Sequence, residues 1–205
     1  MIDTPVSKDL KNFSKFNIVQ NNIKGQTHGT AVLNIIIKYS KHKSFNVNVY
    51  PLKKMNTTEY IDNIKKAIED DVDIIHLSNG IRNYNKKLEN TIKKAENKGI
   101  IVIAAAGNNY GMTMDYPARF KETISIGSLD KNNTKSKSNP YEEMDFYELG
   151  EDINTINKMG SDITVDGNSF SAAIVTGKLI SIFNTKEFEN LNKKEILKKL
   201  EDYHE

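Results

Sequence analysis

Three polar side chains lie among small residues in a way that suits acid–base chemistry: Asp3, His28 and Ser169. A serine nucleophile needs a base to take its proton, and it needs a carboxylate to hold that base in the correct tautomer. Asp3 supplies a carboxylate, His28 opens an apolar helical pattern, and Ser169 stands at the predicted start of another helix. These residue types are those of an orienting acid, a general base and a nucleophile.

Two further features could stabilise the negative charge that develops on a reacting oxygen. At a helix start, the backbone N–H of Ser169 and the positive end of the helix dipole would face such an oxyanion. Gly167 lets backbone and substrate approach closely just before the nucleophile. Asn108 follows a long apolar run and offers a side-chain N–H donor. We therefore predict two oxyanion donors beside Ser169.

The middle of the chain alternates apolar runs with amphipathic helical patterns. Residues 73–78 and 100–106 are typical of strands, and the second run suits a central parallel strand covered on both faces. Strand–helix–strand units imply right-handed crossovers and a parallel sheet. Ligands then bind beyond the carboxyl ends of the strands, where Ser78 and Asn108 lie. The helices between the strands are predicted from apolar faces made by Ile61, Ile64 and Ile68, and by Leu88, Ile92 and Ala95.

Local signals place several other elements. Asn56, with Glu59 three residues later, resembles a capping box, and Gly99 suits a helix end. His76 lies inside a predicted strand, and we interpret it as a packed, hydrogen-bonded histidine. Further patterns predict a hairpin over residues 153–165, a helix over 169–183 and an amphipathic helix over 193–203.

The composition excludes several classes of protein. The 205 residues, 38% hydrophobic and 27% charged, fit a folded globular chain. A formal charge of +2 argues against nucleic-acid binding, and the absence of cysteine excludes disulfides, thiol catalysis and Cys-ligated zinc. No run approaches the ~20 apolar residues of a membrane span. No signal pattern opens the chain, so we expect a cytoplasmic location as given, or secretion if an upstream segment is missing.

The motifs resemble those of the subtilisin-like serine proteases, or subtilases, in the order Asp, His, Ser. Five segments carry the resemblance: Ile2-Asp3-Thr4, His28-Gly29-Thr30, Gly167-Asn168-Ser169-Phe170-Ser171, Ala104-Ala105-Ala106-Gly107-Asn108, and residues 73–80. Tyr116-Pro117-Ala118 resembles a further landmark, in which the proline is often cis. The resemblance covers about residues 1–183, and we identify the chain as a member of this family.

The resemblance implies peptide-bond hydrolysis. Ser169 would attack the scissile carbonyl, His28 would transfer the proton to the leaving amine, and Asp3 would orient His28. Asn108 and the Ser169 backbone N–H would hold the oxyanion.

The resemblance also implies how the substrate binds. An extended substrate would pair as an added strand with Ser78, Asn79 and Gly80. Ala105, Ala106 and Gly107 would line one side of the pocket for the residue before the cut. Asn109, near that pocket, is neutral, so nothing there demands a basic substrate.

Several positions depart from the family pattern. Pro5 stands where a glycine usually follows the Asp motif, Ala31 replaces a second histidine, and Asn168 replaces a threonine. Ala173 and Ile174 replace a Pro-His pair after the nucleophile. None of these changes removes a catalytic atom.

The largest departure lies before Asp3. In the family this residue ends an interior apolar strand, whereas only Met1 and Ile2 precede it here, and two residues span about 7 Å. We expect a short first strand, unpaired neighbouring edges and an Asp3 near a frayed terminus. Three explanations stay open: a truncated reading frame, a partner or upstream segment that completes the sheet, and a degenerate protease.

The predicted architecture is a three-layer α/β fold with a mostly parallel central sheet, helices on both faces and a truncated first strand. We expect residues 1–205 to form a single catalytic domain, with a core over 1–183 and a C-terminal helix within 184–205. We assign no cofactor and no metal ligand, and the Asx-rich loops leave calcium binding open.

Two functions remain in view. The first is a compact serine endopeptidase with a role in processing, such as leader-peptide removal. The second is a catalytically weak or inactive binding or regulatory module of the same fold. A nucleotide-binding domain is disfavoured, because no G-x-G-x-x-G or Walker pattern follows a strand.

Overall fold

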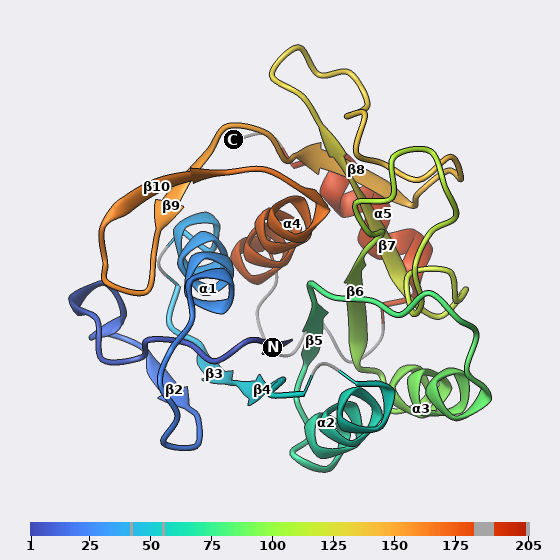
Figure 1. The fold of residues 1–205 in the computed structure, drawn as a ribbon. Helices are drawn as coiled ribbons and strands as arrows, with labels where there is room; N and C mark the ends of the chain where they lie inside the picture. The colour runs from blue at the N-terminus through green and yellow to red at the C-terminus, as the bar shows by residue number, and fades with distance from the viewer. Residues whose placement is uncertain (42, 55, 183–190, 204–205) are drawn as a thin grey trace.

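The computed structural model describes residues 1–41, 43–54, 56–182 and 191–203. Its centre is a six-stranded sheet in the order β4-β1-β5-β6-β7-β8, and every neighbouring pair of strands is parallel (Figure 1). The strands are β1 (Ile2–Asp3), β4 (Tyr50–Pro51), β5 (Ile74–Leu77), β6 (Ile101–Ala105), β7 (Ile124–Leu129) and β8 (Phe146–Leu149). The predicted α/β class is therefore confirmed.

Helices cover both faces of this sheet, as predicted. On one face α1 (Thr27–Tyr39) packs beside α4 (Asn168–Ile182), and α5 (Lys193–Glu201) contacts α4. On the other face α2 (Thr57–Glu69) packs beside α3 (Lys86–Asn97). The short 3-10 helix η1 (Lys11–Phe13) lies between β1 and α1 in the sequence.

Apolar faces hold these layers together. The predicted stripes of α2 and α3 are buried against Ile75 and Val102 of the sheet. On the opposite face, Ile103 and Ile126 pack against Val175 of α4, in a cluster that includes Ile196 of α5. Because alternate residues of a strand point to opposite faces, the apolar strands β5 and β6 supply both cores.

Local signals account for the helix ends. The Asn56 side chain accepts a hydrogen bond from the Glu59 N–H at 2.9 Å, so it caps α2 as predicted. The Glu59 carboxylate instead accepts from the N–H groups of Lys53 and Lys54, and so only half of the capping box forms. Gly99 follows α3 with φ +78°, which suits a glycine at a helix end.

Two small sheets flank the main one. The predicted hairpin is confirmed as antiparallel β9 (Ile153–Ile156) and β10 (Asp162–Val165), and β9 packs against α1. A parallel pair is formed by β2 (Asn17–Val19) and β3 (Asn46–Asn48). The predicted helix over 169–183 begins at Asn168, and Phe183 lies outside the described residues, as do 184–190 and 204–205.

The first strand is short, as expected, but it is not frayed. Ile2 pairs with Tyr50 on one side and with Leu77 on the other. Tyr50 N–H donates to Met1 O at 3.0 Å, and Leu52 N–H donates to Asp3 O at 2.8 Å. Buried on both faces and bonded along its backbone, Asp3 has no exposed surface.

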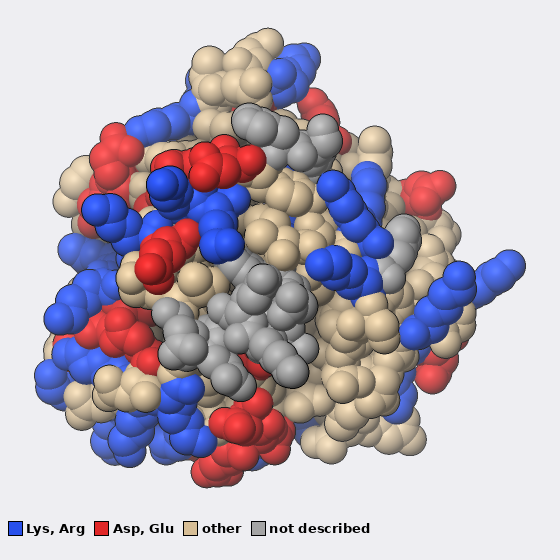
Figure 2. All heavy atoms as spheres, turned by 180° about the vertical axis from the view of Figure 1, so that it is seen from behind, with Lys and Arg blue, Asp and Glu red and all other residues tan. Residues whose placement is uncertain are grey.

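Charged side chains are mixed over the back of the molecule. Figure 2 shows Lys and Arg interspersed with Asp and Glu there, rather than gathered into a face of one sign. In the part of the chain that the structure describes, no helix is long and apolar enough to cross a membrane.

Candidate active site

Three different elements bring the predicted triad residues to one end of the sheet. Asp3 is the last residue of β1, His28 is the second residue of α1, and Ser169 is the second residue of α4. The carboxyl ends of β5 and β6 lead directly into the predicted substrate segments at the same end. Parallel topology therefore gathers residues that are up to 166 positions apart (169 − 3) in the sequence.

The fully buried Asp3 and the partly exposed His28 form a hydrogen-bonded pair. His28 Nδ1 lies 2.8 Å from Asp3 Oδ1, and that oxygen also accepts from the Thr4 N–H at 2.5 Å. Thr4 Oγ1 in turn accepts from the Gly29 N–H at 2.9 Å. A Cβ on Gly29 would lie 2.1 Å from Thr4 O, so only glycine lets the start of α1 approach the Asp3 turn this closely.

The pair favours an ionised acid and a basic histidine. Burial alone would raise the pKa of Asp3, but the hydrogen bond and charge of His28, with the Ser78 hydroxyl and the Thr4 N–H, lower it below its usual value. Burial would lower the pKa of His28, but its hydrogen bond to Asp3 and the charge of that carboxylate raise it above 6.5. Such a histidine can accept a proton at Nε2, and the Asp3 carboxylate beside Nδ1 stabilises the positive charge that results.

The candidate nucleophile stands beside this pair. Ser169 Oγ donates to Ser78 O at 3.0 Å, and the ring of the next residue, Phe170, lies 5.5 Å from the His28 ring between centroids. The His28 side chain is 35% exposed, so its ring is open to solvent on one side. Among the described residues, Ser169 and His28 form no hydrogen bond with each other, and such bonds are often long before substrate binds.

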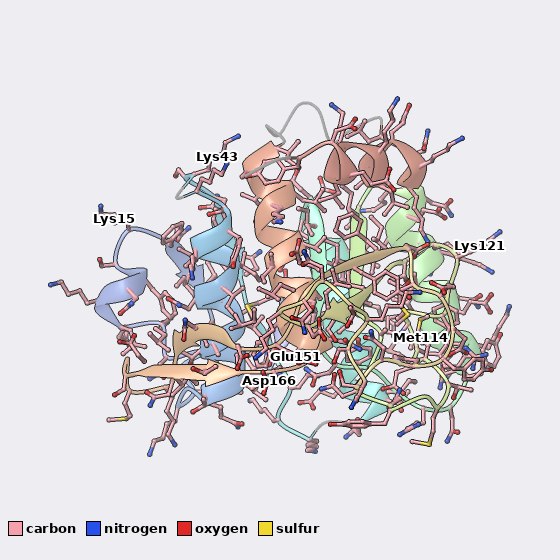
Figure 3. All side chains as sticks on the ribbon, turned by 90° about the horizontal axis from the view of Figure 1, so that it is seen from above. Lys15, Lys43, Met114, Lys121, Glu151 and Asp166 are labelled. Atoms are coloured by element: carbon pink, nitrogen blue, oxygen red, sulfur yellow. The ribbon has the colours of Figure 1, made fainter. Side chains whose placement is uncertain are left out.

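The turn before Ser169 is held by the ends of the hairpin. Gly167 N–H donates to Gly150 O at 2.7 Å, and Gly167 has φ +132°, which favours glycine. Asp152 N–H donates to Asp166 Oδ1 at 2.7 Å, which ties the two hairpin ends together just before this turn. Figure 3 shows Glu151 and Asp166 from these ends lying near each other.

Asn168 links the candidate oxyanion donor to the nucleophile, a role that the sequence analysis missed. Its backbone N–H donates to Asn108 Oδ1 at 3.0 Å, and its side-chain Nδ2 donates to Gly107 O at 2.8 Å. Asn168 has no exposed surface. In the sequence, the one sign of this role is that the residue before Ser169 carries an amide side chain, which can both donate and accept hydrogen bonds. Asn108 Oδ1 is thus occupied, whereas among the described residues its Nδ2 donates no hydrogen bond, so this amide group can serve another acceptor.

The predicted substrate segments lie side by side but differ in exposure. In the 78–80 segment, Ser78 is buried, Asn79 is partly buried and Gly80 is exposed. In the 105–107 segment, the Ala105 and Ala106 side chains are buried in the core, and Gly107 is the accessible member.

Asn109 lies close to the 105–107 segment, since a Cβ built on Gly107 would lie 2.6 Å from Asn109 Nδ2. It is 4% exposed, and its Nδ2 donates to Thr113 O at 2.9 Å within its own loop. The Tyr116–Pro117 peptide bond, downstream of that loop, is cis.

His76 extends the site into the interior, and the interpretation of this residue as a packed, hydrogen-bonded histidine is confirmed. Its Nδ1 lies 2.8 Å from Thr176 Oγ1, and its Nε2 lies 2.7 Å from Ser78 Oγ. Burial lowers the pKa of His76 to about 3, so the ring is neutral at physiological pH.

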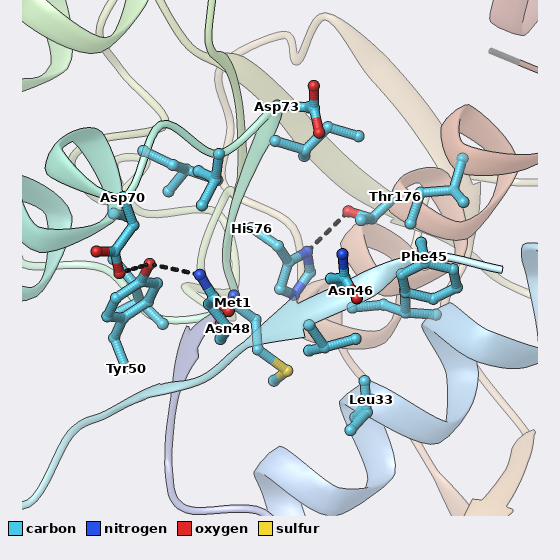
Figure 4. A pocket seen from close by; sticks show the side chains of 18 of the residues that line it. Met1, Leu33, Phe45, Asn46, Asn48, Tyr50, Asp70, Asp73, His76 and Thr176 are labelled. Carbon is cyan, nitrogen blue, oxygen red and sulfur yellow. Dashed lines mark hydrogen bonds between the residues drawn. The ribbon is translucent and has the colours of Figure 1, made fainter. Parts of the chain in front are cut away.

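A cavity of about 740 Å³ lies at the other end of the sheet from the triad (Figure 4). It borders residues 74–76 of β5, which pair with β6 but have no strand partner on the β1 side among the described residues. Met1, His76 and Thr176 are also among its lining residues. The expected unpaired edge is therefore present. No cluster of three or more His, Cys, Asp or Glu residues that could hold a metal ion is found within the described ranges.

Comparison with known proteins shows which family this chain is similar to. The model of the Subtilase family matches residues 8–201. Subtilisin DY of Bacillus licheniformis is 26% identical over 86% of this chain, and this chain spans 73% of that protein. Several other curated subtilisins match at 28% identity, and the chain spans 44% of their length.

Solved structures share the fold. A cold-adapted subtilisin-like serine proteinase matches with a TM-score of 0.84 at 20% identity, covering 98% of this chain and 79% of the other. The prenylagaramide maturation protease PagA matches with a TM-score of 0.79 at 20% identity, covering 88% of this chain and 72% of the other.

Proposed function

Because the chain belongs to the subtilase family of serine proteases, we propose that it is an endopeptidase that uses Asp3, His28 and Ser169 as its catalytic triad. The observation that supports this most is the 2.8 Å contact between His28 Nδ1 and the fully buried Asp3 carboxylate. A carboxylate in this position fixes the histidine tautomer, so that Nε2 is free to accept a proton. In this proposal, residues 1–205 form one catalytic domain.

The reaction would proceed by acyl transfer. Ser169 Oγ attacks the scissile carbonyl carbon while His28 Nε2 takes the hydroxyl proton. The imidazolium that forms is stabilised by Asp3, and it then protonates the leaving amine. Water, activated by the same histidine, hydrolyses the acyl-enzyme and restores the serine.

The oxyanion would be held from two sides. The Ser169 backbone N–H lies at the start of α4, where the helix dipole favours negative charge. The Asn108 amide, fixed through Asn168, offers the second donor. The substrate would lie extended against the 78–80 segment as an added strand.

A fluorophosphonate probe tests the proposal directly, because it reacts only with an activated serine. We expect the wild-type protein to be labelled and Ser169→Ala to stay unlabelled while keeping its fold by circular dichroism. A folded wild-type protein that resists labelling would instead support the second candidate, a catalytically inactive binding module. Two observations favour that alternative: the Ser169 hydroxyl contacts Ser78 O, and β1 has only two residues.

The unpaired side of β5 supports a further part of the proposal. An extended apolar segment, from a partner or from upstream in the same polypeptide, would pair with residues 74–76 and fill the adjoining cavity. Hydrogen exchange of the β5 amides tests this, because pairing should slow exchange there. A processing role is proposed by analogy with PagA, which is a maturation protease.

A further inference from the structure

The two predicted substrate segments are joined at one end by Asp115 and Tyr116. Asp115 N–H donates to Ala106 O at 3.0 Å, which ties it to the 105–107 segment. Tyr116 and Ile81 exchange both backbone hydrogen bonds, at 2.7 and 2.8 Å, just after the 78–80 segment. The backbone of residues 115–116 therefore bridges the two segments.

The Asp115 side chain lies between two glycines, one from each segment. A Cβ built on Gly80 would lie 2.6 Å from Asp115 Cβ, and one built on Gly107 would lie 2.5 Å from Asp115 Oδ2. Real Cβ atoms do not approach other atoms that closely, so both positions must lack a side chain for the carboxylate to lie there. The glycines thus admit an acidic group between the two segments.

This carboxylate is poorly compensated. The Asp115 side chain is only 17% exposed, and its buried Oδ1 has no hydrogen-bond partner in the described part of the chain. The nearest cation, Arg82, places Nε 3.8 Å from Oδ1, and the Arg82 side chain is 53% exposed. Burying a carboxylate is costly unless it is paired and hydrogen-bonded, whereas one long contact to an exposed arginine contributes little.

The position of Asp115 relative to the candidate nucleophile suits a substrate that has a long side chain just before the scissile bond. Ser169 contacts Ser78 O, and Gly80, which borders Asp115, lies two residues further along the segment. Two extended residues span about 7 Å. Lysine and arginine combine a long stem with a cationic head, and so either can reach across such a span to a carboxylate.

We propose that Asp115 selects substrates with lysine or arginine immediately before the scissile bond. The inference rests on the proposed protease function and adds its substrate class. The basic side chain would enter between Gly80 and Gly107 and pair with the Asp115 carboxylate in place of Arg82. Asn109, whose Nδ2 also lies close to Gly107 and donates to Thr113 O, is neutral and so offers no charge to a basic side chain.

The first test compares cleavage of two peptides that differ only in arginine or norleucine before the scissile bond. We expect kcat/KM to favour the arginine peptide by at least about tenfold, the scale of one desolvated charge pair. Asp115→Asn should remove most of this preference. Asp71→Asn is the matched control, since Asp71 is an exposed acid on another face, and it should keep the preference. Equal cleavage of both peptides by the wild-type protein would overturn the inference.

The second test does not depend on catalysis. The Ser169→Ala variant should bind the arginine peptide at least about tenfold more tightly than the norleucine peptide in a fluorescence titration. Adding Asp115→Asn should equalise the two affinities. If the wild-type protein cleaves neither peptide while this binding preference persists, the proposed catalysis fails and the inference stands. Equal or absent binding of the two peptides contradicts it.

Arg82 provides the remaining check. If arginine from the substrate replaces Arg82 beside Asp115, then Arg82→Ala should keep or increase the preference for the arginine peptide. A loss of the preference in this variant, with thermal stability unchanged, would show that the preference depends on Arg82 rather than on a carboxylate freed from it, and would contradict the inference.

Discussion

The Ser169 hydroxyl donates to the Ser78 carbonyl at 3.0 Å, which places the candidate nucleophile in contact with the segment proposed to pair with substrate. The same hydroxyl must turn toward His28 Nε2 for proton transfer. Because His28 is held by its hydrogen bond to Asp3, we expect the Ser169 side chain to be the group that rotates. Substrate that pairs with the 78–80 segment would compete for this edge and favour that rotation.

The two serines at the start of α4 should differ sharply in their effects on activity. Ser169→Ala removes the proposed nucleophile, and we expect kcat to fall by about 10⁶-fold, the scale seen when subtilisin itself loses its serine. Ser171→Ala is the matched control, since its buried Oγ has no hydrogen-bond partner among the described residues and its loss should leave activity nearly unchanged. Peptide hydrolysis measures the activity of the two variants, and thermal melting checks that both keep their fold. Turnover by Ser169→Ala would refute the assignment.

The acid limb of the pH–activity profile should report His28. Catalysis needs this histidine neutral, and because Asp3 raises the His28 pKa above 6.5, kcat/KM should fall as the pH drops through a value above 6.5. Asp3→Asn removes the negative charge beside His28 and the carboxylate that accepts from its Nδ1–H. The acid limb of the profile should therefore move to lower pH, and kcat should fall by about 10⁴-fold. If the acid limb stays at the same pH in the Asp3→Asn variant, the limb reports the titration of a group other than His28.

Asn108 should matter for turnover more than for substrate binding. Asn108→Ala removes one of the two proposed oxyanion donors, and kcat should fall by about 10²–10³-fold, a figure that derives from subtilisin itself, with KM little changed. Asn168→Ala should lower kcat in the same direction, because the Asn168 side chain holds Gly107 beside the nucleophile. Steady-state kinetics on both variants would separate the effect on kcat from the effect on KM. A change confined to KM would place these residues in ground-state binding instead.

Stability in acid should depend on His76. Its pKa is about 3 in the folded protein because of burial, and about 6.5 when unfolded, so between these values only the unfolded state binds the proton. The free energy of unfolding should therefore fall as the pH decreases from about 6.5, by up to about 1.4 kcal/mol per pH unit from this group. His76→Asn should lose less stability between pH 7 and pH 5 in chemical denaturation. Parallel losses in the two proteins would exclude this contribution.

Local patterns in the sequence predicted much of the architecture. The apolar stripes of α2 and α3, the Asn56 cap, the hairpin and the parallel strands all depend on periodicity or on neighbouring residues. The family motifs also indicated Asp3, His28 and Ser169 as candidates, because the order of motifs along a chain can be read directly. The parallel topology then implied that their segments end at one edge of the sheet.

The remaining features depend on contacts between distant segments, which no local period encodes. Asp3 was expected near a frayed end, yet backbone bonds to β4 bury it completely. Asn168 was noted only as a replacement for threonine, yet it bonds to Gly107, 61 residues away. Asn109 is expected near the pocket, and its Nδ2 does lie close to Gly107, but packing also places the Asp115 carboxylate between the two glycines, which no local pattern indicates. The sequence by itself determined which residue types and elements are available, and tertiary packing decided which side chains meet, because burial and hydrogen bonding are settled only when separate segments come together.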